Sequence, residues 1–347
     1  MIFALSALSV FSGAALAGSC ASYGDFTEVC AVADSPDLTE SSGLAVSPTR
    51  GVLYTHEDSG GEAEIYACQP DGTPRGTSVV SGAAFIDWED LAMGPCPDDS
   101  SLNCLYIADI GDNFRFRGFV VVYAVREPSA DGESLDVVAT WTVTYPEGPQ
   151  DAEAIIVHPW TGAIFLVTKE SAEPSRVYRL PWRPTGDEPK PMTLVAEVPI
   201  DQPEGGGHMV TGAAFDPDAD RVVWRTYSHV MIWSADPCDP DATWAGAPTY
   251  LPTTDLQGEA VTIDPGTGDV LTTSEGSPLM LSEFACVDYL TPDVDCPEVD
   301  TGDTGDTGAL ADTGSPKVEE SPSCGCRGRA WFLPLLPLAL RRRRARR

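Results

Sequence analysis

Five similar segments recur along this chain, and acidic side chains stand at matching places in four of them. The segments begin at Glu40, Trp88, Asp151, Thr211 and Gln257, and each continues as a short run of small and apolar residues. Four of the five carry acids before or at the start of that run, whereas the segment at Thr211 does not. Carboxylate oxygens brought together from such segments could bind a divalent cation, because hard cations prefer oxygen ligands.

Each of these segments has the composition of a first strand, and a second strand follows it after a turn. The turns are rich in Pro, Gly and Asp, as in residues 47–51 and 264–268. Further strands follow, for example over residues 120–123, and no amphipathic helix is visible. Repeats of about 50 residues with four strands each are typical of a β-propeller. The sequence therefore predicts an all-β fold with a single β-propeller over residues 20–298.

Five repeats favour five blades, and a six-bladed ring is the alternative. The fifth repeat is short, so we expect an N-terminal strand over residues 26–32 to supply its outer strand and close the ring. Closure there favours the disulfides Cys30–Cys286 and Cys20–Cys296, while Cys96–Cys104 would link a local hairpin. The eight cysteines that precede the C-terminal tail allow many other disulfide connectivities, which stay open.

The propeller topology brings these acids to one place. The first strand of a blade runs beside the central channel and the second returns, so residues before the first and after the second share a face. Carboxylates gathered there cannot all stay ionised without a compensating positive charge. The candidate metal ligands are Glu40, Glu89, Asp90, Asp151, Glu153, Glu259 and Glu275, and Glu57, Asp58 and Asp87 occupy similar positions.

Calcium is the metal that these positions favour. They supply oxygen ligands without clustered thiolates or imidazoles, and their spacing on loops is irregular, which suits the flexible coordination of Ca²⁺. The alternative is that these acids cap turns, accept backbone hydrogen bonds or face water.

Other polar residues at the ends of second strands form a candidate ligand-binding set. Lys169 and Arg225 either bind a phosphate or carboxylate group of a ligand or neutralise nearby acids. The set is Lys169, Arg225, Asp109, Asp112 and Asn113.

Three residues are candidates for catalysis. Glu89 and Glu153 could activate water, and His56 could transfer protons because imidazole titrates near neutral pH. The chain has no G-x-S-x-G motif, so serine-hydrolase chemistry is disfavoured.

Charge and cysteine content limit the partners and the compartment. With 53 acidic and 21 basic residues the net charge is −32, and a surface this negative repels phosphate backbones, which excludes nucleic-acid binding. Ten cysteines indicate export to an oxidising compartment. The apolar run over residues 2–17 agrees, since it predicts a signal peptide over residues 1–17.

The last fifty residues have a different composition. Residues 299–323 repeat Asp-Thr-Gly and predict a disordered linker. Residues 324–347 contain Cys-Gly-Cys, an apolar run too short for the roughly 20 residues of a membrane span, and an arginine cluster. This ending resembles the Myxo-type C-terminal sorting signal, which implies a mature protein anchored at the outer cell surface. The alternative is a basic tail that contacts anionic lipid.

The repeat motifs also resemble a family. Glu-Ser-Ser-Gly-Leu at 40–44, Asp-Trp-Glu-Asp-Leu-Ala at 87–92, Asp-Ile-Gly-Asp-Asn at 109–113, Asp-Ala-Glu-Ala at 151–154 and Gln-Gly-Glu-Ala at 257–260 resemble motifs of secreted bacterial propellers. These are the propellers related to the esterase-like-phytase and SdiA-regulated groups. The resemblance spans about residues 38–280 and implies a propeller with calcium in its channel.

Two functions remain open at this point. The first is a cell-surface, calcium-binding propeller that binds an extracellular small molecule, polymer or protein, and acts as a monomer with membrane contact only through its C-terminal anchor. The alternative is a calcium-dependent phosphoesterase or esterase-like hydrolase at the acidic mouth of the channel. The sequence leaves open whether the protein is an enzyme.

Overall fold

The computed structural model describes residues 20–32, 38–172, 174–201, 207–255, 257–276 and 279–290. Within this part the regular secondary structure is almost entirely β-strand, with one short 3-10 helix, η2 (Pro240–Ala245). Among the described residues, no helix is long and apolar enough to cross a membrane. The predicted signal peptide (1–17), linker (299–323) and C-terminal tail (324–347) lie outside the described residues.

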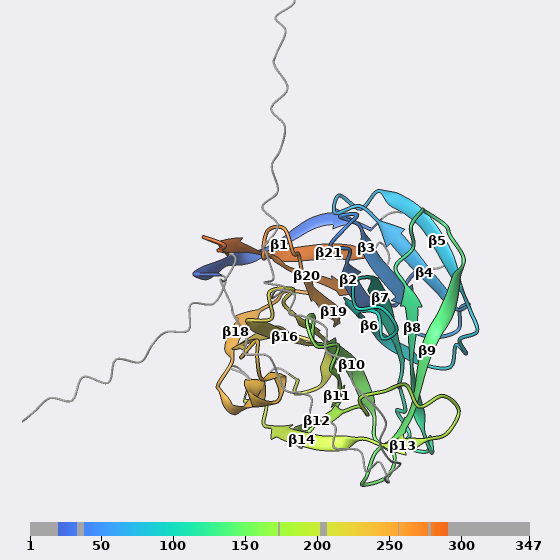
Figure 1. The fold of residues 1–347 in the computed structure, drawn as a ribbon. Helices are drawn as coiled ribbons and strands as arrows, with labels where there is room; N and C mark the ends of the chain where they lie inside the picture. Colours follow the sequence, from blue (N-terminus) through green and yellow to red (C-terminus); the bar gives the residue numbers. More distant parts are fainter. Residues whose placement is uncertain are drawn as a thin grey trace, which may run out of the picture. The chain divides into compact units, whose positions relative to one another are not determined.

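The strands pair antiparallel in groups of four, from an innermost strand outward (Figure 1). At the outer edge, β5 and the short β13 (Lys190–Pro191) each pair in parallel with β9. The groups are β2 (Ser41–Val46), β3 (Leu53–Glu57), β4 (Glu64–Cys68) and β5 (Pro74–Ser81); β6 (Trp88–Pro95), β7 (Asn103–Asp109), β8 (Val120–Arg126) and β9 (Leu135–Thr144); β10 (Ala152–Val157), β11 (Ile164–Thr168), β12 (Ser175–Arg179) and β14 (Thr193–Val198); β15 (Val210–Phe215), β16 (Arg221–Thr226), β17 (His229–Ser234) and β18 (Thr249–Pro252); and β19 (Gly258–Ile263), β20 (Val270–Ser274), β21 (Met280–Val287) and β1 (Ser22–Ala31).

The innermost strands form a closed ring. β2 contacts β6 and β19, β10 contacts β6 and β15, and β15 contacts β19. Every residue of β2, β10, β15 and β19 is buried, because these strands have neighbours on both sides. This cyclic arrangement of antiparallel sheets confirms the predicted β-propeller.

Close packing between innermost strands explains why the repeat motifs use small residues. A Cβ atom on Gly43 of β2 would lie 2.6 Å from the backbone nitrogen of Leu91 in β6, which is closer than real Cβ contacts come. Only glycine fits at that point of the ring.

The N-terminal strand closes the propeller as predicted. β1 pairs antiparallel with β21 and becomes the outer strand of the last sheet, although it begins earlier than residue 26. A disulfide between Cys20 and Cys286 links the two strands. The predicted pairings Cys30–Cys286 and Cys20–Cys296 are therefore wrong, since the register places Cys30 opposite Leu281 and leaves it a free thiol.

The hairpin disulfide Cys96–Cys104, by contrast, is confirmed. It joins the end of β6 to the start of β7, where the two strands pair through Gly94 and Cys104.

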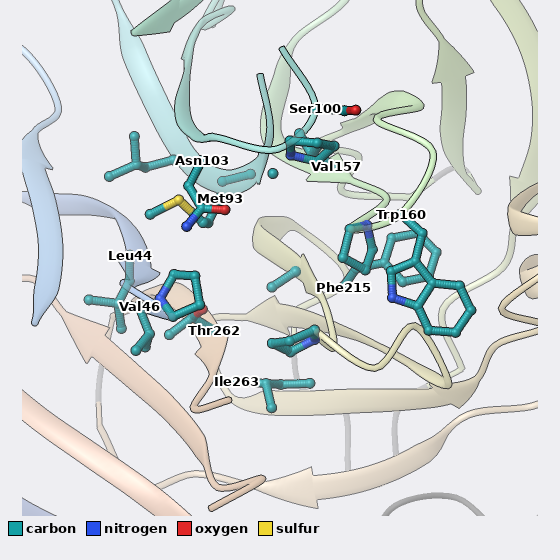
Figure 2. Close-up of a pocket in the computed structure, with 18 residues that line it drawn as sticks. Leu44, Val46, Met93, Ser100, Asn103, Val157, Trp160, Phe215, Thr262 and Ile263 are labelled. Atoms are coloured by element: carbon teal, nitrogen blue, oxygen red, sulfur yellow. The ribbon is translucent and has the colours of Figure 1, made fainter. Parts of the chain in front are cut away.

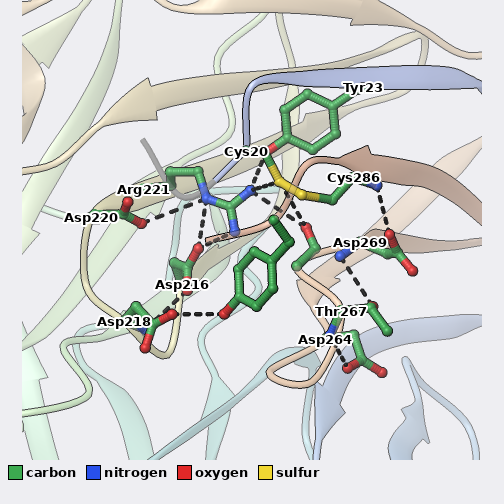
Figure 3. The surroundings of a disulfide bond; sticks show 12 residues. Cys20, Tyr23, Asp216, Asp218, Asp220, Arg221, Asp264, Thr267, Asp269 and Cys286 are labelled. Carbon is green, nitrogen blue, oxygen red and sulfur yellow. Dashed lines mark hydrogen bonds and ion pairs between the residues drawn. A yellow bond between two sulfur atoms is a disulfide. The ribbon is translucent and has the colours of Figure 1, made fainter. Parts of the chain in front are cut away.

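A buried charge network surrounds the closure disulfide (Figure 3). The Nε of Arg221 donates to Oδ2 of Asp216 at 2.6 Å, and its guanidinium also contacts the Tyr23 hydroxyl and the Gly268 carbonyl. Charge-assisted bonds of this kind are stronger than neutral ones. They tie the start of β1 to β16 and to the turn before β20, so the closure is held by more than the disulfide.

Candidate metal centre

Each innermost strand has an irregular pairing at its second residue. The register with the neighbouring strand skips that residue in four of the strands, and in β19 it skips both Glu259 and Ala260, which is the pattern of a β-bulge. A bulge leaves a residue outside the ladder and redirects its side chain. The second residues of the five strands are Ser42, Glu89, Glu153, Thr211 and Glu259.

A second set of side chains comes from the residue just past each second strand. In four of the groups this residue is Asp58, Lys169, Tyr227 or Glu275. Because the first and second strands of a group are antiparallel, these positions lie at the same end of the ring as the bulges.

All members of the two sets except Thr211 meet around one cavity of about 190 Å³, which we name the acidic cavity. All of its lining residues are polar, and six acids face one lysine. It brings together five of the predicted metal ligands with Lys169 and Asn113. The lining residues are Glu40, Ser42, Asp58, Glu89, Asn113, Glu153, Lys169, Tyr227, Glu259 and Glu275.

Three carboxylates are arranged most tightly. Ligand oxygens of Asp58, Asp87 and Glu89 all lie within 4.8 Å of one another. The loop after β7 packs against this cluster. The backbone nitrogens of Ile110 and Gly111 in this loop donate to the Asp87 carbonyl at 3.1 and 3.2 Å. A Cβ on Gly111 would overlap the carboxylates of Glu89 and Asp87, so only glycine allows this close approach.

Burial and mutual repulsion raise the pKa values of several acids in the cavity. Burial, with the charge of Asp87, raises the pKa of Asp58 to about 7. Burial, with the charge of Glu153, raises the pKa of Glu259 to about 9, and burial raises the pKa of Glu153 itself to about 8. The pKa of Glu89 lies well above its ordinary value for the same reasons. Without a cation, burial and repulsion therefore disfavour the charged form of these groups.

The lysine of the cavity is held by its neighbours. Nζ of Lys169 forms an ion pair with Glu153 and lies 5.2 Å from the centre of the Tyr227 ring. Burial lowers the pKa of Lys169, but the Glu153 carboxylate outweighs this effect and the net pKa is raised. Lys169 therefore stays charged and offsets one carboxylate of the six.

Asp90 does not reach the acidic cavity. It is fully buried, with Oδ1 accepting from the nitrogen of Leu91 at 2.8 Å and Oδ2 from those of Ile155 and Ala213 at 3.0 and 3.2 Å. The structure thus does not support Asp90 as a metal ligand. Its carboxylate instead joins β6, β10 and β15 at the centre of the ring.

Three other predicted acids also have protein partners. Asp109 pairs with Nη2 of Arg117 at 2.8 Å, and the carboxylate of Asp112 accepts from the nitrogens of Phe116 and Arg117 at 2.9 and 2.7 Å. Asp151 accepts from the nitrogen of Asp112 at 3.2 Å. These acids do not line the cavity; they stabilise the loop that carries Asn113.

Arg225 and His56 are also displaced from their predicted roles. Nη2 of Arg225, a fully buried side chain, pairs with Asp255 at 2.6 Å. His56 is fully buried, its Nδ1 lies 3.0 Å from the Glu57 carbonyl, and burial lowers its pKa to about 4. Neither residue lines the acidic cavity, so Arg225 does not bind ligand there and His56 does not serve as its proton donor.

The set predicted from sequence omitted Tyr227 and Ser42 and did not rank Asp58 and Asp87 as ligands. The signal for Tyr227 was its position one residue past the second strand, which it shares with Lys169. The sequence places Arg225 at the end of its second strand, whereas β16 continues to Thr226. That difference moves Arg225 into the sheet and Tyr227 to the cavity.

Comparisons with known proteins add little beyond the fold. The sequence matches no protein-family model and no curated protein. Among solved structures, the chain is similar to a gluconolactonase from Xanthomonas campestris, with 15% identity over 76% of this chain and 89% of that one and a TM-score of 0.43. It is also similar to a luciferin-regenerating enzyme, with 9% identity over 72% of this chain and 92% of that one and a TM-score of 0.39. A third similar structure is a glucose dehydrogenase, with 11% identity over 76% of this chain and 99% of that one and a TM-score of 0.43. Similarities this distant carry no argument about activity.

We predict that Asp90→Asn destabilises the propeller. The amide has one accepting oxygen in place of two, and its NH₂ group would face a backbone donor, so buried hydrogen bonds are lost at a cost of roughly 1–3 kcal/mol. Denaturant unfolding measures this, with the exposed Asp99→Asn as the control. An unchanged unfolding free energy would contradict the central role of Asp90.

The stability of the metal-free protein should depend on pH. A carboxyl group whose pKa rises on folding contributes stability that is complete below its unfolded pKa and is lost as the pH passes its folded pKa. For Glu259 these values are 4.5 and about 9, so the melting temperature in chelator should fall across that range. Glu259→Gln should reduce the slope, and an unchanged slope in that variant would contradict the shift.

Proposed function

We propose that the protein binds Ca²⁺ in the acidic cavity and acts as a binding module. The observation that carries this proposal is the state of Glu89. Its side chain is only 4% exposed, it lines the cavity, and it makes no hydrogen bond or ion pair within the described residues. A buried carboxylate without a partner is costly, and a bound cation would satisfy it.

The chemistry of the cavity suits a hard cation. Its potential ligands are carboxylate, hydroxyl and amide oxygens, with no cysteine or histidine among the lining residues. They come from loops and bulged strands of different groups, which favours the larger and more flexible coordination of Ca²⁺ over the strict octahedron of Mg²⁺. Asp58, Asp87 and Glu89 would hold the ion, with Glu40, Glu259 and Glu275 near it.

The rim of the cavity supports binding of a further partner. Phe114 and Phe116, next to the cavity residue Asn113, are 85% and 74% exposed. Two arginines hold their loop in place. Arg115 pairs with Glu170 at 2.7 Å, and Nη1 of Arg117 donates to the carbonyl of Gly111 at the start of the loop. Ordered, exposed aromatic side chains beside a charged cavity are typical of binding surfaces. In this proposal they contact an extracellular small molecule, polymer or protein.

The proposed setting is the outer cell surface, with the propeller as a monomer and the tail at 324–347 as its only membrane contact. The disulfides Cys20–Cys286 and Cys96–Cys104 support an oxidising compartment. Anchoring itself rests on the resemblance of the tail to a sorting signal.

Calorimetric titration tests the metal site. Chelated protein should bind Ca²⁺ and melt at a higher temperature with it, because a ligand that binds only the folded state stabilises that state. Glu89→Gln should lower the affinity by about tenfold or more, since ligand charge sets Ca²⁺ affinity. The exposed Glu62→Gln is the matched control. A melting temperature that is the same with calcium and with chelator would rule out the site.

A second candidate function is calcium-dependent hydrolysis of phosphoesters or esters. The observation in its favour is that Asp58 and Glu153, with pKa values of about 7 and 8, border the cavity and could exchange protons at neutral pH. Against it, His56 lies elsewhere, and Lys169 is already paired with Glu153.

Assays on phosphomonoesters and carboxylic esters separate the two functions. If the protein is a binding module, its turnover in the presence of calcium should be no higher than that of the Glu153→Gln variant. Turnover that chelation and Glu153→Gln both abolish, while Glu62→Gln retains it, would establish the hydrolase instead.

A further inference from the structure

The other end of the ring carries a second hollow of about 230 Å³ (Figure 2). It lies where the innermost strands finish. Val46, Val157, Phe215 and Ile263 are the last residues of β2, β10, β15 and β19, and all four line it. We name it the apolar hollow. It is built from every innermost strand, so the ring itself forms it rather than one loop.

The described residues that line the apolar hollow carry no charge. None of its 18 lining residues is acidic or basic, in a chain that has 53 acids. Its walls are mainly aliphatic side chains, with prolines from the turns that follow the strands. Such a surface disfavours charged molecules and gains free energy when it covers apolar area.

The two ends of the ring are chemically separate. The apolar hollow and the acidic cavity share no lining residue. Asp90, with both oxygens bonded to backbone nitrogens, lies on β6 next to Leu91 of the hollow and Glu89 of the cavity. The residues that line one site are therefore not the residues that line the other.

Two residues indicate what the hollow would recognise. Thr262 is 6% exposed and lines the hollow, and its hydroxyl makes no hydrogen bond within the described residues. Of the other two polar residues that line the hollow, Ser100 is exposed and the amide nitrogen of Asn103 donates to Glu127, so Thr262 offers the buried polar contact. Trp160 lies at the rim with 44% of its surface exposed, so its indole can stack on a flat ligand.

We infer that the apolar hollow binds a small, uncharged, flat apolar molecule with a single hydrogen-bonding group. A dry apolar cavity of about 150 Å³ accepts benzene, so a hollow of 230 Å³ has room for a fused pair of rings. The hydrogen-bonding group would meet the Thr262 hydroxyl, and Trp160 would cover one face of the rings.

Naphthalene and 2-naphthol are matched probes, because they differ only by a hydroxyl group and both are uncharged at neutral pH. Fluorescence titration of the folded, full chain should show saturable binding of both, unchanged by chelator. Thr262→Val should weaken 2-naphthol by about fivefold and leave naphthalene unchanged, as expected for one neutral hydrogen bond.

Trp160→Ala should weaken both probes by about tenfold. Trp182→Ala is its control, since Trp182 is also exposed but does not line the hollow. Circular dichroism and melting curves check that each variant is folded. The inference is overturned if neither probe binds, if Trp182→Ala weakens binding as much as Trp160→Ala, or if sedimentation shows that a second copy of the chain covers the hollow.

Discussion

Repulsion among the carboxylates at one end of the ring is the constraint on which the rest of the structure depends. Six acids and one lysine surround a cavity of about 190 Å³, and burial strengthens their mutual effect. The closed ring of innermost strands holds these groups together, and β1 with the disulfide Cys20–Cys286 holds the ring closed. Burial, together with repulsion between neighbouring carboxylates, raises the pKa values of Asp58 and Glu259.

Two adjacent acidic residues, Glu89 and Asp90, have different roles in the ring. Glu89 faces the cavity and has no hydrogen-bond partner within the described residues, whereas Asp90 accepts three backbone hydrogen bonds from β6, β10 and β15. It closes the centre of the ring between an acidic end and an uncharged end. The propeller thus presents two sites of contrasting chemistry, built from the two ends of the same strands.

Much of the site follows from repeat position. An acid at the second residue of a first strand reaches the cavity in three groups, through Glu89, Glu153 and Glu259, because the same bulge recurs in each. Position alone does not separate Lys169 from Arg225. One lies just past its second strand and the other lies inside it, and that difference depends on where β16 ends.

The sequence by itself determined the all-strand repeats, the closing strand and the acids that converge, because these depend on local pattern and on the alternation of strands and turns. Only the tertiary structure decided which acids are free and which are bonded, which cysteine meets Cys286, and that an apolar hollow exists. Those outcomes depend on partners from other sheets: Asp90 meets Ile155 and Ala213, and Cys286 meets Cys20. The repeat pattern predicts which strands and segments come together, but it does not specify which individual side chains meet across them.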